Sequence, residues 1–362
     1  MIRLIKPYIS YSDIEKEFKE IFDSGIFTKG KYVHELEDVI KQYTGAKYSF
    51  FTTSATTALT MALKVIDIKP GDEVIVSDFS FPATVNVVED LYATPVFCDV
   101  DKSTYNMSAQ ILEQKISKKT KAVIFVDALG NPSGIHQIKS ICEKHNIPLI
   151  EDAACALGSS ENGVRCGNIA DLTCFSFHPR KLLTTGEGGC IQTNNSEYAD
   201  ILQVKLAHGA TVVDGKFDFV DYGYNYRLPE LQSIMGIKQI ARLDEVIKRR
   251  QDLKKMFAEK LEPYGILAQK TTKNVNHNVQ SAVFYVPENI DRDELIGYLR
   301  SNDIETTIGT YCLSGCTYYL RKYNQLQPIA DNLFKHTITL PCHDEVDADY
   351  VCNKIISFVE GK

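Results

Sequence analysis

The sequence predicts an α/β protein with a mainly parallel sheet between layers of helices, followed by a smaller second α/β domain. Between about residues 45 and 195, short apolar runs alternate with helical patterns. This alternation is typical of parallel strands that are buried on both faces. After Asn225 the pattern changes to a long helical segment and then to a mixed tail. The length of 362 residues also suits two domains that share a substantial core.

Five apolar runs predict strands of the large sheet. They are VIVSDF at 74–79, PVFCDV at 95–100, KAVIFVDA at 121–128, PLIEDA at 148–153 and LTCFSF at 172–177. Between the runs, apolar residues follow helical spacing, as Ile138, Ile141 and Cys142 do. Ligands of parallel sheets collect at the carboxyl ends of the strands, so residues that directly follow these runs are the first candidates for a site.

The second domain is predicted from the segment that follows. A long segment from Pro229 to about Leu261, rich in Lys, Arg, Leu and Ile, is predicted to be helical. Pro263 and Gly265 then mark a break before the mixed tail. We therefore expect residues 1–245 to form the large domain and residues 246–362 the smaller one.

Charge and composition exclude several classes of function. The formal net charge of −7 argues against binding to nucleic acid or to an anionic membrane surface. The N-terminal segment MIRLIKPYISYSD lacks the apolar core of a secretory signal, and no run is long enough to cross a bilayer. We expect a cytoplasmic protein without nucleic-acid or membrane partners.

The ten cysteines are scattered along the chain, several of them inside apolar runs. This distribution predicts buried free thiols rather than a disulfide framework. Cys312 and Cys316 could supply half of a zinc site, but no second Cys/His pair at ligand spacing follows them. We expect a loop with two packed thiols there, and no bound metal.

Two strand ends carry groups suited to carbonyl and amine chemistry. In FSFHPRKLLTTGEGG at 175–189, Lys181 follows an apolar strand. A lysine there can be partly desolvated, so that its neutral amine attacks a carbonyl carbon, although a solvated surface lysine is the common alternative. In EDAACALG at 151–158, Asp152 ends another strand. Its carboxylate could keep the ring nitrogen of pyridoxal phosphate cationic, or it could cap the next helix.

A third segment, TTSATTALTMAL at 52–63, leads hydroxyl-bearing and small residues into a helix. The backbone N–H groups at a helix N-terminus, with Thr56 and Thr57 nearby, would suit a phosphate group. Simple N-capping of the helix by a hydroxyl is the alternative.

A set of six segments, taken in order along nearly the whole chain, resembles the DegT/DnrJ/EryC1/StrS family of fold-type I pyridoxal-phosphate enzymes, which includes sugar-nucleotide aminotransferases. The resemblance runs through GDEVIVSDFSFPATVNVV, PVFCDVD, IEDAACALG, FSFHPRKLLTTGEGG, GYNYRLPELQ and LPCHDE. It implies an aspartate-aminotransferase-like large domain with a seven-stranded sheet. It also implies pyridoxal 5'-phosphate as cofactor, with pyridoxamine phosphate as an intermediate.

The resemblance implies a role for each matching residue. Lys181 forms the internal aldimine and later moves a proton, and Asp152 binds the pyridine nitrogen. Phe81 stacks on the cofactor ring, although it could instead be a core residue. The remaining matches hold the cofactor's phosphate, and they are Thr56, Thr57 and Ser176.

Asn225 resembles the asparagine that reaches the phosphate of the neighbouring subunit's cofactor, which implies a homodimer with composite sites. A turn residue beside Gly223 is the local alternative. By the same resemblance, Arg227 organises this loop, whereas His178 receives no role.

Three departures from the family pattern stand out. Cys155 occupies the position near the cofactor's phenolic oxygen where many relatives have Gln or His, which would alter hydrogen bonding to the cofactor. Ala55 replaces a usual glycine, and FTKG at 27–30 replaces Thr-Gly-Pro where a sugar substrate often sits.

The predicted reaction moves an amino group from L-glutamate to a nucleotide-linked 4-keto- or 3-keto-6-deoxy sugar. A smaller ketone, such as a ketose phosphate, a polyol phosphate or a cyclitol, is an alternative acceptor. Relatives with histidine in place of the lysine are sugar dehydratases, so Lys181 favours aminotransfer over dehydration. A catalytically silent binding or regulatory protein is a further alternative, which Lys181, Asp152 and Ser176 disfavour.

Overall fold

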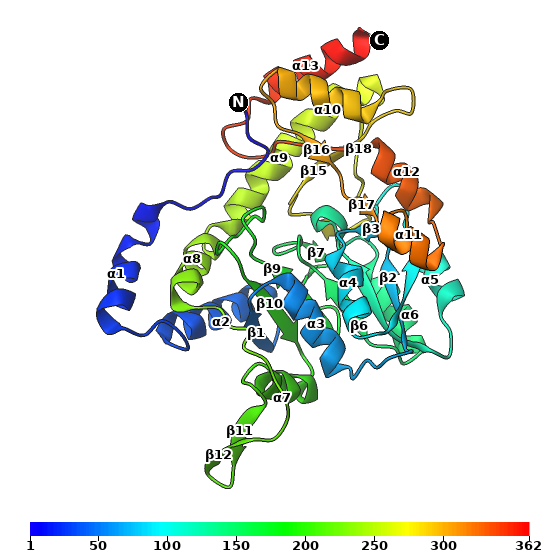
Figure 1. Cartoon of the computed structure of the whole chain (residues 1–362). Coiled ribbons are helices and arrows are strands. Elements are labelled where there is room, and N and C mark those ends of the chain that lie inside the picture. Colours follow the sequence, from blue (N-terminus) through cyan, green and yellow to red (C-terminus); the bar gives the residue numbers. More distant parts are fainter. Residues whose placement is uncertain (362) are drawn as a thin grey trace.

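A seven-stranded sheet forms the centre of the computed structural model, which describes residues 1–361 (Figure 1). Across the sheet the order is β1 (Tyr48–Thr52), β10 (Gly189–Thr193), β9 (Leu172–Ser176), β6 (Leu149–Asp152), β5 (Thr120–Val126), β2 (Glu73–Ser77) and β4 (Thr94–Cys98). The strands from β9 to β4 are parallel, and β10 is antiparallel to both of its neighbours. The predicted mainly parallel seven-stranded sheet is confirmed.

Both faces of the sheet are buried, because successive residues of its apolar strands point to opposite sides. Val74 and Val76 pack into one core with α3 (Ala55–Val65), α4 (Ala83–Asp90) and α7 (Ser196–Lys205). Ile75 lies in the opposite core with α5 (Ala109–Lys115) and α6 (Ile135–Lys144). Helices therefore cover the sheet on both sides, as the sequence predicts.

The β1 end of the sheet is covered by helices from both ends of the large domain. The helix α2 (Lys31–Thr44) packs there beside α8 (Glu230–Ile240), and α1 (Glu15–Ser24) follows the short helical turn η1 (Tyr11–Asp13). The Glu230 carboxylate, which is 2% exposed, accepts hydrogen bonds from the backbone N–H groups of Gly30 (2.9 Å), Tyr32 (2.9 Å) and Val33 (3.1 Å). It caps the N-terminus of α2 from a distant part of the chain.

The segment from Pro229 to about Leu261 is helical, as predicted, but two helices occupy it. After α8, the residue Arg242 leaves helical geometry (φ −116°, ψ 8°), and α9 (Leu243–Leu261) begins. The Arg242 guanidinium binds the backbone oxygen of Tyr8 and the Asp13 carboxylate (3.2 Å). These partners at the N-terminal segment hold the break in place.

A second sheet with its own core follows α9. Its strand order is β13 (Leu267–Ala268), β15 (Ala282–Tyr285), β18 (Thr337–Leu340) and β16 (Thr307–Ile308). It packs with α9, α10 (Arg292–Ser301) and α13 (Ala348–Glu360), after the turn η3 (Glu262–Tyr264). The N-terminal segment joins this part, since Ile2 pairs with Ile304. The predicted domain boundary at 245/246 falls in the first turn of α9 and stays a prediction.

One stretch of the C-terminal part returns to the large sheet. The strand β17 (Tyr311–Cys312) pairs with β3 (Phe79–Ser80), and α11 (Thr317–Tyr323) and α12 (Pro328–His336) follow it (Figure 1). Leu313 and Tyr319 are buried in the same core as α3 and α4. The C-terminal part therefore reaches the edge of the sheet where the strands β2 and β4 end.

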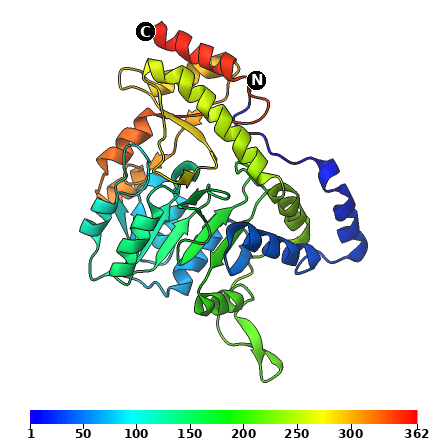
Figure 2. The same cartoon turned by 180° about the vertical axis from the view of Figure 1, so that it is seen from behind.

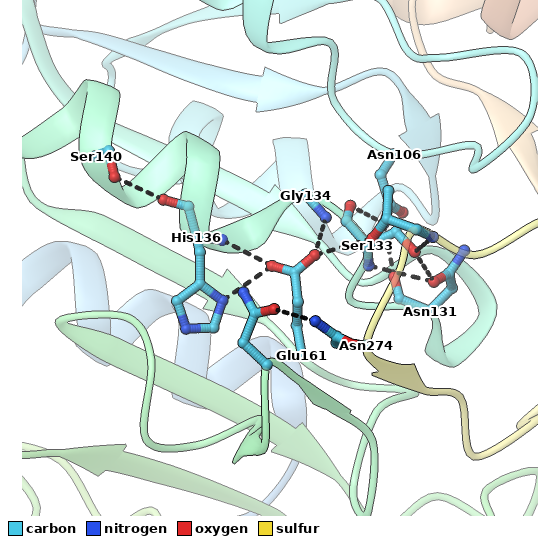
Figure 3. Close-up of polar contacts among 10 residues, drawn as sticks. Asn106, Asn131, Ser133, Gly134, His136, Ser140, Glu161 and Asn274 are labelled. Carbon is cyan, nitrogen blue, oxygen red and sulfur yellow. Dashed lines mark hydrogen bonds and ion pairs between the residues drawn. The ribbon is translucent and has the colours of Figure 1, made fainter.

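A polar network joins α6 to the small sheet of β14 (Val275–Asn276), β7 (Ser160–Glu161) and β8 (Val164–Arg165) (Figure 3). Glu161 accepts hydrogen bonds from the backbone N–H groups of Gly134 (2.7 Å) and His136 (3.0 Å) and lies 2.9 Å from His136 Nδ1. Thr272 Oγ1 also donates to it (3.1 Å). These hydrogen bonds lower the Glu161 pKa despite burial, so a carboxylate stabilises the N-terminus of α6.

A hairpin of β11 (Ala210–Val213) and β12 (Lys216–Phe219) projects away from the body of the molecule in both views (Figures 1 and 2). Its side chains include the exposed Val212 (66%), Phe217 (71%) and Phe219 (65%). Large exposed apolar side chains gathered on one element mark an interaction surface.

The cysteine prediction is confirmed, since all ten thiols are free and eight of them are buried. Cys312 donates to Asp78 Oδ2 (3.2 Å) and Cys316 to the backbone oxygen of Cys312 (3.4 Å). Within residues 1–361, no helix is long and apolar enough to cross a membrane.

Candidate active site

Lys181 lies in the loop between β9 and β10, in a pocket at the carboxyl edge of the large sheet. Its Nζ is 3.0 Å from Sγ of Cys155, which follows β6. Both side chains are half-buried, and Ser176, the last residue of β9, lines the same pocket. The structure therefore brings together three predicted site residues that lie up to 26 positions apart.

Asp152, the last residue of β6, is 5% exposed. Its Oδ2 accepts a hydrogen bond from Thr84 Oγ1 (2.8 Å), and its Oδ1 accepts one from the backbone N–H of Ala154 (3.3 Å). Burial raises the pKa of Asp152, while these two hydrogen bonds and the charge of Lys181 lower it. A cation placed against this carboxylate would offset the cost of its burial.

The N-terminus of α3 is capped as the alternative interpretation of TTSATTALTMAL predicts. Ser54 Oγ accepts from the backbone N–H of Thr57 (3.2 Å), and Thr57 Oγ1 accepts from the backbone N–H of Ser54 (3.1 Å). Thr56, the next residue toward the N-terminus, is exposed. Because Thr57 is engaged in the cap, a ligand at this end of α3 would meet the exposed Thr56 and the positive end of the helix dipole.

Gly189 allows the N-terminus of α3 to approach β9. It pairs with Ser176 on one side and with Thr52 on the other. A Cβ at this glycine would lie 2.4 Å from the backbone carbon of Ser54, which no side chain tolerates. Ser176 and the start of α3 are therefore close neighbours.

Phe81 is 64% exposed, which excludes the alternative that it is a core residue. It precedes α4 by two positions, and Thr84, in the first turn of that helix, contacts Asp152. Its ring lies edge-on to that of Tyr311, with centroids 6.3 Å apart. The Phe81 side chain is therefore accessible, at the turn into the helix whose Thr84 contacts Asp152.

Asn225 lies outside this pocket. It is exposed, in the segment between β12 and α8. The neighbouring Gly223 packs tightly, because a Cβ there would lie 2.1 Å from the backbone nitrogen of Gly209. Arg227 is half-buried in the same segment, and His178 is half-buried beside the Lys181 loop, where burial lowers its pKa.

The geometry fits pyridoxal phosphate. The Lys181 amine suits the cofactor's aldehyde. The Asp152 carboxylate, which accepts one hydrogen bond on each oxygen, has acceptor capacity left for the protonated ring nitrogen. Ser176 and the start of α3 offer a hydroxyl and a helix N-terminus for the phosphate group.

Residues 9–358 match the family described as the DegT/DnrJ/EryC1/StrS aminotransferase family. The chain belongs to this family. Membership confirms the resemblance, the fold type and the class, a pyridoxal-phosphate-dependent aminotransferase.

Relatives of known name agree with this assignment. The chain is 32% identical to GDP-perosamine synthase of Escherichia coli O157:H7, over 96% of both chains. It superposes on the PLP-form of a putative sugar aminotransferase from Streptococcus pneumoniae with a TM-score of 0.92 and 28% identity, over 99% of both chains. A GDP-4-keto-6-deoxymannose-3-dehydratase is 26% identical with a TM-score of 0.90, over 98% of this chain and 100% of that one.

The sequence did not point to Gln280, which holds the Lys181 loop of this aminotransferase. Its Oε1 accepts from the backbone N–H of Leu182 (2.9 Å), and its Nε2 donates to the backbone oxygen of Arg180 (2.6 Å). The residue is 6% exposed. Because it lies 98 positions from Leu182, no local pattern marks it.

The residue before Gln280 has an unusual backbone. Val279 has a φ of 53°, a left-handed conformation that a β-branched residue adopts only under constraint. The buried Arg250 supplies the constraint, donating to the backbone oxygens of Val279 (2.8 Å) and Gln280 (2.8 Å). On the other side, Asn278 Nδ2 donates to the backbone oxygen of Cys155 (2.9 Å). The strained turn thus presents two amide side chains to the site.

A buried acidic group lies directly behind Asp152. Asp127, Glu151 and Cys166 are fully buried, with potential ligand atoms within 4.8 Å of one another. Burial, followed by the charge of Glu151, raises the pKa of Asp127. Two carboxylates this close in a fully buried site disfavour each other's charge, which favours the protonated form of one of them.

Proposed function

We propose that the chain transfers an amino group from L-glutamate to a nucleotide-linked keto-sugar, with Lys181 and Asp152 as the catalytic residues. One observation carries the proposal, namely that the Lys181 amine, the buried Asp152 carboxylate and Ser176 lie at one edge of the sheet. When bound, pyridoxal phosphate supplies a carbonyl for amines and a ring that stabilises negative charge on the adjacent carbon.

The residues divide the work between them. Lys181 Nζ would hold the cofactor through its carbonyl group and, once free, its amine would accept and donate the proton that amino transfer moves. Asp152 would accept a hydrogen bond from the ring nitrogen and keep that nitrogen protonated. Cys155, whose Sγ is 3.0 Å from Nζ, would lie near the cofactor's phenolic oxygen, as the family resemblance implies.

The other predicted residues bind rather than react. Ser176 and the threonines at the start of α3 hold the phosphate, with Thr56 the more accessible of the two. Phe81 stacks on the ring, which its 64% exposure permits.

The names of relatives support the acceptor class, since they include enzymes of GDP-linked sugars. A ketose phosphate, polyol phosphate or cyclitol is the second acceptor class. Dehydration, the reaction in the name of one relative, is disfavoured because an amine at position 181 is what amino transfer requires. The cytoplasmic location stays a prediction.

A homodimer with composite sites is part of the proposal. The projecting hairpin with its exposed valine and phenylalanine side chains supports it. Asn225 is exposed, just beyond this hairpin, where a second subunit could receive it.

An absorbance titration tests the function. L-Glutamate should convert the visible band of the lysine-bound cofactor to a near-ultraviolet band, and a keto-sugar nucleotide should restore it. Lys181→Ala should abolish both changes and turnover, whereas Lys118→Ala, at an exposed position, should keep them. A visible band that no amino donor shifts would instead support dehydration or a silent protein.

A further inference from the structure

We propose that Thr84 is a positioning residue for Asp152, the middle member of a hydrogen-bond relay that starts at Ser80. This inference rests on the proposed role of Asp152 at the cofactor's ring nitrogen. Ser80 Oγ lies 2.9 Å from Thr84 Oγ1, which lies 2.8 Å from Asp152 Oδ2. The three side chains are 4%, 0% and 5% exposed, so water does not compete for these bonds.

The charge of Asp152 fixes the direction of the relay. An ionised carboxylate only accepts hydrogen bonds, so the Thr84 hydroxyl donates its single hydrogen to Oδ2 of Asp152. The contact between the two hydroxyls is then made by the hydrogen of Ser80. Each bond polarises the next, so the relay strengthens the donor that Asp152 receives.

The C-terminal part of the chain holds the start of the relay. Ser80 lies in β3 and pairs with Tyr311 of β17, and Thr310 Oγ1 donates to the backbone oxygen of Ser80 (3.0 Å). The buried Asp78 carboxylate accepts from both the backbone N–H and the hydroxyl of Ser314 (2.7 Å each). These contacts fix β3 at both of its ends, just before the turn into α4.

Thr84 thereby sets the plane of the Asp152 carboxyl group. The other donor to this carboxylate, the backbone N–H of Ala154, is at a longer distance of 3.3 Å and reaches Oδ1. Because Thr84 binds Oδ2 firmly, the lone pairs of the Asp152 carboxylate that accept no hydrogen bond are directed toward a ligand at the end of the strand. Loss of the hydroxyl would leave a buried carboxylate with one weak donor and a less defined orientation.

Two substitutions separate this role from simple packing. Thr84→Val keeps the shape and removes the hydroxyl, whereas Thr84→Ser keeps the hydroxyl and removes a methyl group. The dissociation constant of pyridoxal phosphate, measured by equilibrium dialysis, should rise about tenfold to a hundredfold in Thr84→Val, as for a lost hydrogen bond to a charged group. Thr84→Ser should retain the native value, and kcat should follow the same order.

The result that overturns the relay is an unchanged dissociation constant in Thr84→Val, or an equal loss in Thr84→Ser. If Thr84→Val does not fold, Ser80→Ala takes its place in the test. Ser80→Ala should weaken cofactor binding, and an unchanged dissociation constant of pyridoxal phosphate would contradict the relay. Asp152→Asn separates this inference from the proposed function. Unchanged cofactor binding and turnover in Asp152→Asn would refute the role of Asp152. If Asp152→Asn weakens cofactor binding and the double variant with Thr84→Val weakens it no further, Thr84 acts through Asp152.

Discussion

Single buried polar side chains hold the reactive loop of this enzyme from distant parts of the chain. Gln280 bonds the backbone on both sides of Lys181, and the constrained Val279 beside it depends on the guanidinium of Arg250. Such bonds fix the position of the lysine more tightly than packing of its flexible side chain could.

Gln280→Glu should reduce kcat/KM by about tenfold to a hundredfold, because the oxygen that replaces Nε2 would face the backbone oxygen of Arg180 and displace the loop. Steady-state kinetics with a keto-sugar acceptor measure the effect, and circular dichroism checks the fold. Gln114→Leu, on the exposed face of α5, is the control. Native kinetics in Gln280→Glu would show that the two bonds do not position Lys181.

The buried acid pair predicts an alkaline loss of stability. Burial, reinforced by Glu151, raises the pKa of Asp127 above that of the unfolded chain. The folded state therefore binds more protons than the unfolded state, and the free energy of unfolding falls as pH rises above about 4.

Asp127→Asn should reduce this fall and raise the free energy of unfolding at pH 8 by about 1 to 3 kcal/mol, while the buried Glu151 keeps its own, smaller pH dependence. Urea unfolding between pH 5 and pH 8 would measure it, with the exposed Asp200→Asn as control. An equal difference between variant and wild type at every pH would contradict the shared proton.

At the scale of helices and strands, the sequence pattern predicted elements whose burial is decided locally. Five strands of the large sheet were predicted because their apolar runs cross its core, namely β2, β4, β5, β6 and β9. The break at Arg242 and the pairing of β17 with β3 were not, because both depend on partners more than 200 positions away. Likewise Lys181, Asp152 and Cys155 became candidates from local motifs, whereas Thr84 and Gln280 did not, because their partners lie 68 and 98 positions away.

The N-terminus of α2 depends on Glu230. Glu230→Ala should lower the free energy of unfolding by about 1.5 to 3 kcal/mol, because three backbone N–H groups lose a charged acceptor. Glu230→Gln, which keeps one oxygen acceptor, should lose less. Thermal or urea unfolding measures both variants, and equal stability of Glu230→Ala and wild type would refute the cap.

At the scale of the whole molecule, the hairpin of β11 and β12 carries the proposed contact with a second copy. Replacing Phe217 and Phe219 together by Asp should convert a dimer to a monomer in sedimentation experiments, because their exposed rings would no longer be buried on association. Replacing the exposed Tyr92 by Asp, at a loop outside the hairpin, is the control. An undisturbed dimer would place the interface elsewhere.

The pairing of Ile2 with Ile304 cannot form until most of the chain has been synthesised, which sets an order for folding. Residue 2 leaves the ribosome well before its partner, by about 15 to 60 s at the usual rates of elongation. During this interval the large sheet, which ends at β10, can form, while the N-terminal segment waits without its neighbour. The pairing of Ile2 with Ile304 is then a late, long-range closure, and a chain arrested before residue 304 would carry a large-sheet domain whose N-terminal segment is open to proteases.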